Sequence, residues 1–139
     1  AIGPGAAEAV PALVKSLGSK NVDVHKSACY ALGKIGPAAA AAIPELTKGL
    51  DSKEATVQLV SVWALLQIEP KNRKTVKTAI PLLTKALESE RELARMEAAA
   101  ALGRIGKRAK SAIPALKKLL DDESTYVRAA AEEALKSLQ

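Results

Sequence analysis

A pattern that recurs four times along the chain constrains its fold more than any other feature of the sequence. Each copy opens with Val or Ile, continues with Pro, and then carries two leucines four residues apart. These openings begin at Val10, Ile43, Ile80 and Ile113. Their prolines stand 33, 37 and 33 residues apart. A period of this length predicts a repeat protein, in which one small unit is stacked several times.

A second apolar segment follows each opening. It starts thirteen residues after the proline, at Val24, Val57, Ala94 and Val127. In the first copy its apolar residues are Val24, Ala28, Ala31, Leu32 and Ile35. This spacing lies on one face of an α-helix and does not fit a strand. Polar turn residues separate the two segments at 18–21, 51–54, 88–91 and 121–124, so each unit is predicted to be a helical hairpin.

These units resemble the HEAT repeat, and within that family the short repeats of phycobilisome (PBS) lyase subunits. Units of that family look like Ile-Pro-x-Leu-x-x-x-Leu followed by Val-Arg-x-x-Ala-x-x-Ala-Leu-Gly-x-Ile-Gly. The resemblance implies an all-α fold, a right-handed α-α superhelix (solenoid) of four HEAT-like helical hairpins. Whether each opening proline starts a helix or kinks a longer one stays open.

The resemblance also implies an ion pair in each unit, between an acidic turn residue and an arginine just after the second helix starts. Two units match this pattern, with the pairs Asp121–Arg128 and Glu88–Arg95. Two units depart from it, with Gly18–His25 and Asp51–Gln58. The ladder of charges is therefore expected to be weaker in the first two units.

The period predicts a single HEAT-like repeat domain over 1–139, with repeats at about 10–36, 43–69, 80–106 and 113–139. Residues 1–9 align with the end of a preceding unit, and the chain has no initiator Met. We therefore expect a fragment of a longer array. Four extra residues lie within 69–78. They equal about one helical turn, so the added length can be absorbed without rotating the apolar face.

Composition excludes several other classes of protein. Nearly half of the residues are apolar (48%) and the net charge is only +6, whereas disordered chains combine low hydrophobicity with high net charge. No apolar run approaches the roughly 20 residues that span a bilayer. One cysteine and one histidine provide neither an internal disulfide nor a zinc site. We expect a soluble, cytoplasmic monomer with no membrane partner.

Catalytic groups are scarce in the sequence. His25 and Cys29 are four residues apart and would share a helix face. They occupy repeat positions that hold Arg95 and Ala99 in the third unit, which favours a structural role. Acidic turns such as 121–123 fit helix starts better than a calcium site. The chain is predicted to be no enzyme, and to need no metal and no cofactor.

The outward positions of the second helices form a candidate binding face. Its apolar and aromatic bulk gathers on the first three units, at Tyr30, Leu59, Trp63, Met96 and the neighbouring Lys26. Exposed aromatic and Met side chains are common in interface hot spots. The sequence therefore predicts a non-catalytic scaffold that binds a protein or peptide. Alternatively, Trp63 fills a gap in the stack.

The connections between units are rich in bases, which predicts a basic edge. Its residues are Lys71, Arg73, Lys74, Lys77, Arg104, Lys107, Arg108 and Lys110. Such an edge attracts the phosphate backbone of nucleic acids, although cations at helix ends also complement the helix dipole. Nucleic-acid binding is thus an alternative function. A chromophore-lyase-type subunit is a further alternative, which the repeat resemblance alone implies.

Overall fold

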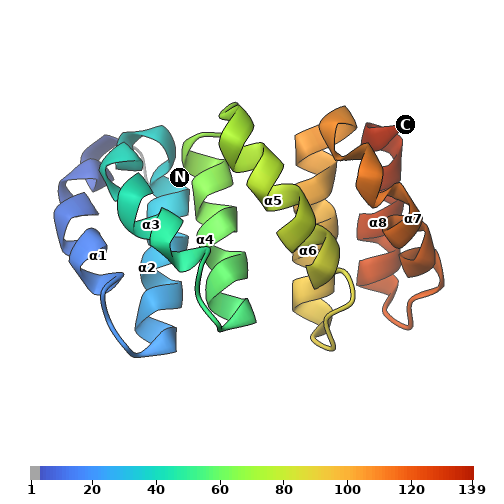
Figure 1. The fold of residues 1–139 in the computed structure, drawn as a ribbon, viewed down its shortest axis with the longest axis horizontal. Coiled ribbons are helices and arrows are strands. Elements are labelled where there is room, and N and C mark those ends of the chain that lie inside the picture. The colour runs from blue at the N-terminus through green and yellow to red at the C-terminus, as the bar shows by residue number, and fades with distance from the viewer. Residues whose placement is uncertain (1–3) are drawn as a thin grey trace. The chain divides into compact units, whose positions relative to one another are not determined.

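The structure is a computed structural model that describes residues 4–139, all of them in helices and the turns between helices (Figure 1). The chain divides into two compact units, Ala1–Val76 and Lys77–Gln139. Helical hairpins build each unit, so the predicted all-α fold of stacked helical repeats is confirmed. None of the helices in this part of the chain is both long and apolar enough to cross a membrane.

The first unit holds two repeats, and each repeat has a short first helix and a longer second helix. The first repeat consists of the 3-10 helix η1 (Pro4–Ala9), α1 (Val10–Ser16) and α2 (Val22–Ile35). The second consists of the 3-10 helix η2 (Gly36–Ala42), α3 (Ile43–Gly49) and α4 (Ala55–Ile68). The two second helices, α2 and α4, pack side by side.

The second unit also holds two repeats, but the first helix of its first repeat is as long as the second helix, with 14 residues in each. Helix α5 (Arg73–Ala86) runs across the division between the units and is followed by α6 (Glu92–Ile105). The last repeat consists of η3 (Gly106–Ala112), α7 (Ile113–Lys118), η4 (Leu119–Asp121) and α8 (Thr125–Leu138). Here α6 and α8 are the second helices, and they also pack side by side.

The opening prolines take two different positions. Pro11, Pro44 and Pro114 lie in the first positions of α1, α3 and α7, each directly after a 3-10 stretch. Proline suits these positions because the first helical N–H groups have no partner inside the helix. Pro81 instead lies inside α5, which is one continuous helix. Both possibilities that the sequence left open are therefore realised.

The four extra residues lie in the connection between α4 and α5, at 69–72, and do not lengthen a helix by a turn. Both helices have 14 residues. The Asn72 side-chain oxygen accepts a hydrogen bond from the backbone N–H of Thr75 at 3.1 Å, which is a helix-start contact. The apolar face keeps its phase as expected, because Val76, Ala79 and Leu83 are all buried.

The core is a row of equivalent leucines from successive repeats. Those on the second helices are Leu32, Leu65, Leu102 and Leu135, and those on the first helices include Leu46, Leu83 and Leu116. All of them are buried. Gly36 and Gly106, which end α2 and α6, have φ values of +76° and +78°. Only glycine adopts this backbone conformation readily. A glycine therefore ends one second helix in each unit, α2 in the first and α6 in the second.

Candidate functional site

His25 and Cys29 lie between α2 and α4, and they do not form a catalytic pair. Cys29 is fully buried, and burial raises the pKa of its thiol to about 11, although a hydrogen bond with Ser61 acts in the opposite direction. Such a thiol stays protonated at neutral pH and is a poor nucleophile. His25 Nδ1 lies 3.0 Å from the carbonyl oxygen of Leu17, and Nε2 lies 3.4 Å from the Ser61 hydroxyl.

The contacts of His25 define which ring nitrogen donates a hydrogen bond and what the side chain does. A carbonyl oxygen can only accept, so Nδ1–H donates to Leu17. In the neutral ring, Nε2 then accepts from the Ser61 hydroxyl. Ser61 is fully buried and was not singled out by the sequence analysis, because a lone serine on an apolar helix carries no signal. Both ring nitrogens of His25 thus have partners other than Cys29.

The same repeat position makes the same kind of hydrogen bond in all four repeats. Its side chains donate hydrogen bonds to backbone carbonyls near the end of the preceding first helix. The pairs are His25 to Leu17, Gln58 to Leu50, Arg95 to Ser89 and Glu90, and Arg128 to Asp122. Unpaired carbonyls at a helix end need such donors. His and Gln, which depart from the family pattern, therefore preserve this function.

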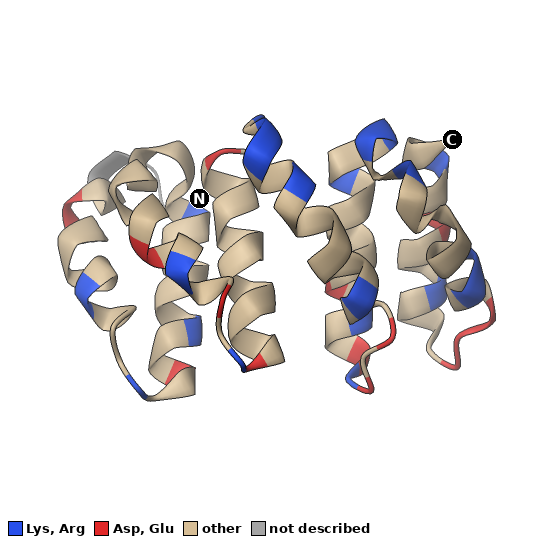
Figure 2. Ribbon diagram, in the orientation of Figure 1, with Lys and Arg blue, Asp and Glu red and all other residues tan. Residues whose placement is uncertain are grey.

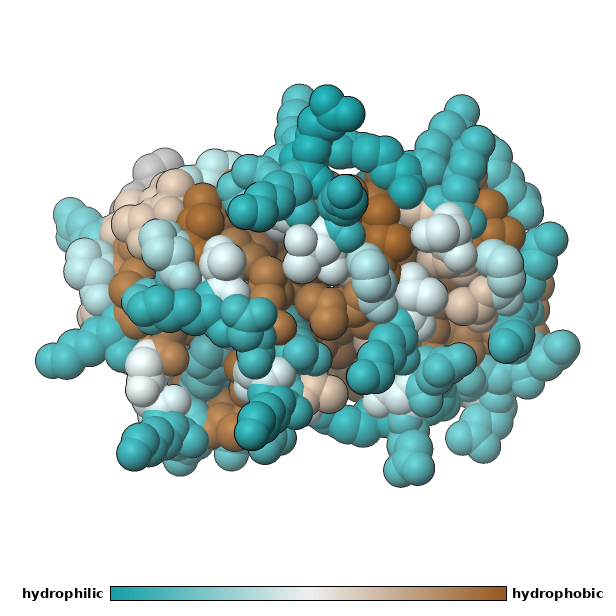
Figure 3. Space-filling view, in the orientation of Figure 1, coloured by the Kyte–Doolittle hydropathy of each residue, from teal (hydrophilic) through white to brown (hydrophobic). Residues whose placement is uncertain are grey.

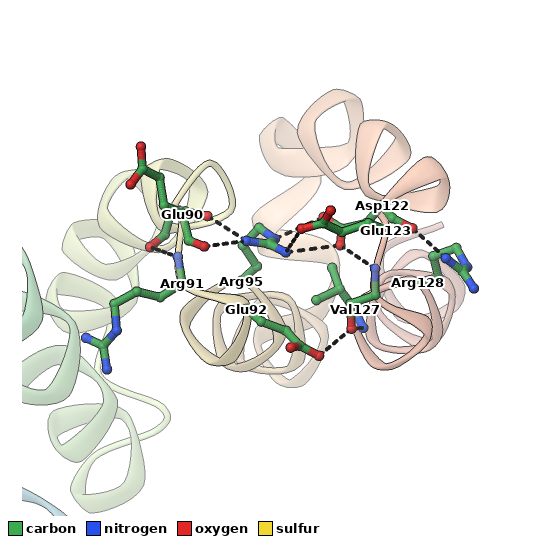
Figure 4. Close-up of polar contacts among 10 residues, drawn as sticks. Glu90, Arg91, Glu92, Arg95, Asp122, Glu123, Val127 and Arg128 are labelled. Carbon is green, nitrogen blue, oxygen red and sulfur yellow. Dashed lines mark hydrogen bonds and ion pairs between the residues drawn. The ribbon is translucent and has the colours of Figure 1, made fainter.

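Arg95 also joins two successive repeats (Figure 4). Its Nε and Nη2 atoms bind the two carboxylate oxygens of Asp122 at 2.9 and 3.2 Å, and each side chain is only 10% exposed. The predicted pairs Glu88–Arg95 and Asp121–Arg128 are wrong. Among the described residues the ion-pair partners of Arg95 are Asp122 and Glu123, both in the turn of the following repeat. The family pattern located the arginine correctly, but the pairing runs between two successive repeats of the second unit.

The environment of Asp122 favours its charged form. The backbone N–H of Ser124 lowers the pKa of this carboxyl, and the Arg95 guanidinium lowers it further, while partial burial opposes both. The N–H of Ser124 lies 3.0 Å from Asp122 Oδ1. The bidentate pair with Arg95 and the hydrogen bond from the Ser124 N–H together hold the carboxylate in one orientation. This contact therefore stabilises the second unit and is no catalytic site.

The predicted binding residues of the first unit are all partly buried, and two of them, Tyr30 and Trp63, are in contact. Tyr30 and Trp63 have ring centroids 5.1 Å apart, tilted by 52°. The Trp63 ring also covers Gly33, where an added Cβ would lie 2.3 Å from its nearest ring carbon. Leu59 and Lys26 are half-buried. The Trp63 ring thus fills the space between α2 and α4, which is the alternative role that the sequence allowed.

Met96, the fifth predicted residue, belongs to the second unit and lines a separate hollow. This hollow has a volume of about 330 Å³ and is lined by Glu92, Leu93, Met96 and Tyr126. Leu93 is 51% exposed and Tyr126 is 72% exposed. Neither residue was among those predicted from the sequence to bind a partner. A signal existed, because Leu93 and Tyr126 hold the same repeat position, where the first two units carry Asp23 and Thr56.

A second hollow lies beside the first on the same pair of helices. Its volume is about 470 Å³, and its lining residues are Ala100, Gly103, Arg104, Ala130, Glu133, Ala134 and Ser137. Met96 and Ala100 are one turn apart on α6, as are Tyr126 and Ala130 on α8. The two hollows therefore follow one line along the helix pair, which we call the α6–α8 groove.

The bases predicted for one edge belong to two segments of the chain, one around the start of α5 and one where α6 gives way to η3 (Figure 2). Lys71, Arg73 and Lys74 are exposed around the start of α5, at the end of the first unit. Lys77 is exposed on α5 in the second unit. Arg104, Lys107, Arg108 and Lys110 are exposed where α6 gives way to η3. Hydrophilic side chains project from this end of the second unit (Figure 3).

Solved structures with similar folds include engineered proteins and designed armadillo repeat proteins. One engineered protein is 28% identical, with a TM-score of 0.68 over 95% of this chain and 66% of its own. A designed armadillo repeat protein, solved in complex with the peptide (KR)4, is 26% identical, with a TM-score of 0.71 over 95% of this chain and 65% of its own. The chain thus spans slightly less than two thirds of each. No curated protein matches the sequence.

The family model for HEAT repeats matches residues 2–66 and 43–136. These two matches together cover both units and the helices that build every hairpin. The hydrogen-bonding position shared by His25, Gln58, Arg95 and Arg128 shows the same repetition at the level of single contacts. The chain therefore belongs to the HEAT-repeat family.

Proposed function

We propose that the α6–α8 groove binds a peptide segment of a protein partner. The observation that carries this proposal is the hollow at Leu93, Met96 and Tyr126, where two large apolar or aromatic side chains are more than half exposed. Large side chains around a hollow are the usual anchors of a protein interface. The proposal keeps the predicted class of partner and the predicted Met96, and it adds Leu93 and Tyr126.

The contrast between the two units supports the choice of this groove. Trp63 of α4 covers Gly33 of α2 and fills the space between these helices. At the equivalent position of the second unit, Glu133 replaces Trp63, and Gly103 packs against Ala134, whose Cα would lie 3.1 Å from an added Cβ. No aromatic ring covers Gly103, and a hollow of about 470 Å³ lies beside it, with Glu133 in its lining. The first unit closes its own groove, whereas the second leaves room for a ligand.

The dimensions of the groove suit a short peptide. Each of the two helices has 14 residues, which corresponds to a length of about 21 Å. An extended peptide of about six residues covers this distance. The designed armadillo protein with its bound (KR)4 peptide shows that a similar fold carries a peptide in that case. A non-catalytic scaffold is the function that this geometry supports best.

A peptide-display library of random dodecamers, selected on the whole chain, tests the proposal. Selected peptides should lose binding at least tenfold on Tyr126→Asp or Leu93→Asp, because a carboxylate in the hollow must lose water when the peptide docks. Leu120→Asp is the matched control, since Leu120 is 37% exposed but lies in η4, away from the groove. Fluorescence anisotropy measures the affinity, and equal losses in all three variants would contradict the proposal.

A second substitution closes the groove without adding a charge. Glu133→Trp introduces a tryptophan into α8 at the repeat position that Trp63 holds in α4. It should abolish peptide binding while thermal unfolding stays at or above its original midpoint. Undiminished binding to this variant would exclude the groove as the binding site.

The two alternative functions keep simple tests. Phosphate-backbone binding by the bases of the basic edge would appear as duplex DNA binding that collapses between about 50 and 200 mM salt. A chromophore-lyase-type role would appear as retention of a bilin by the purified chain. That role is supported only by the similarity of the repeats to those of phycobilisome lyase subunits.

A further inference from the structure

We infer that the peptide held by the α6–α8 groove carries an acidic segment, which lies against four bases at the end of α6. These bases are Arg104, Lys107, Arg108 and Lys110, and we call them the η3 cluster. The inference rests on the proposed function and adds the chemical class of the partner. It also gives the η3 cluster a role that peptide binding in the hollow alone does not require.

The fold itself does not need the η3 cluster. The equivalent segment η2 has nearly the same backbone, since its glycine has a φ of +76° against +78° in η3. The following kink matches too, at Ala39 (φ −92°, ψ 19°) and Ala109 (φ −95°, ψ 20°). Yet at the positions of Lys107, Arg108 and Lys110 the segment η2 carries Pro37, Ala38 and Ala40. The η2 backbone thus adopts the same conformation with three uncharged residues, so this conformation does not require the bases of η3.

The η3 cluster is also not neutralised by nearby acids. Its four side chains are exposed, and the ion pairs found in the second unit involve Arg95 and Lys136 instead. Four like charges within seven residues repel one another. An acidic ligand relieves this repulsion, so the cluster complements a partner that is rich in Asp and Glu.

The η3 cluster adjoins the groove, which favours a peptide over a nucleic acid. Arg104 lines the groove and also begins the cluster, two residues before η3 starts at Gly106. A nucleic acid would use the bases but would gain nothing from the exposed Leu93 and the apolar hollow. Glu133, the one acid in this part of the groove, pairs with Lys136 at 3.7 Å. The hollow at Met96 is thus mainly apolar, with Glu92 as the acid in its lining, and the hollow beside it reaches Arg104, where the η3 cluster begins.

The spacing of the two ends predicts the pattern of the ligand. Met96 and Arg104 are eight residues apart on α6, which corresponds to about 12 Å along the helix. An extended peptide covers that distance in about four residues. The peptide should therefore carry a large apolar or aromatic anchor and, about four residues away on one side, the first of several Asp or Glu residues.

Peptides selected from the dodecamer library test this pattern directly. The selected pool should be enriched in Asp and Glu on one side of the anchor only. A fluorescein-labelled selected peptide should bind roughly tenfold more weakly to the triple variant Lys107→Gln, Arg108→Gln and Lys110→Gln at low salt. Its affinity for the unmodified chain should also fall between 50 and 300 mM salt, and much less for the triple variant.

A charge-matched control separates this site from the overall charge. The triple variant Lys15→Gln, Lys20→Gln and Lys53→Gln removes three exposed lysines from the first unit, and it should leave the affinity within about twofold. Circular dichroism verifies that both triple variants keep their helices. An equal loss in the two variants would overturn the inference, because only net charge would then matter.

The outcomes also separate this inference from the proposed function. Peptides that need Tyr126 but show no acidic enrichment and no effect of the η3 substitutions would overturn the inference and leave the groove in place. Peptides that ignore Tyr126 would overturn both. Binding of a 20-base-pair DNA duplex that depends on the η3 cluster and excludes the peptide would show that the cluster serves nucleic acid, and would also overturn the inference.

Discussion

The repeat position held by His25, Gln58, Arg95 and Arg128 shows how one residue can be exchanged without loss of its task. Each side chain has an N–H group that reaches a carbonyl near the end of the first helix. The family preference for arginine is thus a preference for a long donor. At Arg95 the side chain also forms an ion pair, because Asp122 of the following repeat lies beside it.

His25→Gln and His25→Leu test this reading. Gln should preserve most of the stability, because Gln58 already donates to Leu50 from the same position at 3.2 Å. His25→Leu should lower the free energy of unfolding by about 1–3 kcal/mol, since the Leu17 carbonyl and the Ser61 hydroxyl then lose their hydrogen bonds to the imidazole. Urea unfolding followed by circular dichroism gives both free energies. Equal losses for Gln and Leu would show that the imidazole itself is required.

Asp122 predicts how stability depends on acid. Its pKa is held below the ordinary value of 3.8, chiefly by the Ser124 backbone N–H. The stability contributed by the charged carboxylate is therefore complete above the ordinary pKa and is lost as the pH falls through the lowered one. Unfolding free energies should be level above about pH 5 and decline below about pH 4. Asp122→Asn should be less stable at neutral pH and should flatten this decline; an unchanged slope would contradict the assignment.

At the scale of helices, two glycines have different structural roles although both lie in the first unit. Gly33 allows the Trp63 ring of α4 to lie on α2, and an added Cβ would be 2.3 Å from that ring. Gly18 lies in the turn after α1, where an added Cβ would meet only the Lys15 carbonyl oxygen, at an ordinary 3.4 Å. The packing of α2 against α4 therefore depends on the first glycine and not on the second.

Gly33→Ala should accordingly lower the free energy of unfolding by about 1–3 kcal/mol, because the ring must move out of a filled space. Gly18→Ala is the matched control and should change it by less than about 1 kcal/mol. Trp63 fluorescence gives an independent reading, since a displaced ring should emit at longer wavelength. A Gly33→Ala variant with unchanged stability and emission would show that α2 and α4 are less closely packed than described.

For the whole molecule, the division into two units predicts that a substitution destabilises mainly the unit in which it lies. Trp63 is the only tryptophan and lies in the first unit, whereas circular dichroism reports helices in both. Repeat proteins are stabilised mainly by contacts between neighbouring repeats. Asp122→Asn should therefore lower the unfolding midpoint seen by circular dichroism more than the midpoint seen by Trp fluorescence.

Gly33→Ala provides the reverse control for the same two probes, because it lies in the unit that holds Trp63. It should move the fluorescence midpoint at least as much as the circular dichroism midpoint. If both substitutions shift both probes equally, the two units unfold as one cooperative body and the prediction is wrong.

The sequence by itself determined the hairpin repeat, the phase of its apolar face and the family of the chain. These features follow from periodicity, because residues spaced by 3–4 along a helix face the same side whatever lies next to them. The repeat also located the arginines at positions 95 and 128. The class of partner followed from the sequence only as a hypothesis. The candidate binding face was predicted on the second helices, where large side chains gather.

Only the tertiary structure decided which of those side chains fill space and which leave it open. Trp63 covers Gly33 in the first unit, whereas in the second unit Gly103 packs against Ala134 and a hollow lined by Glu133 lies beside it. Arg95 pairs with Asp122 and not with Glu88, since the partner belongs to the next repeat. Both outcomes depend on how neighbouring second helices approach each other. Sequence periodicity fixes the direction of a side chain on its own helix, but not the distance to the next one.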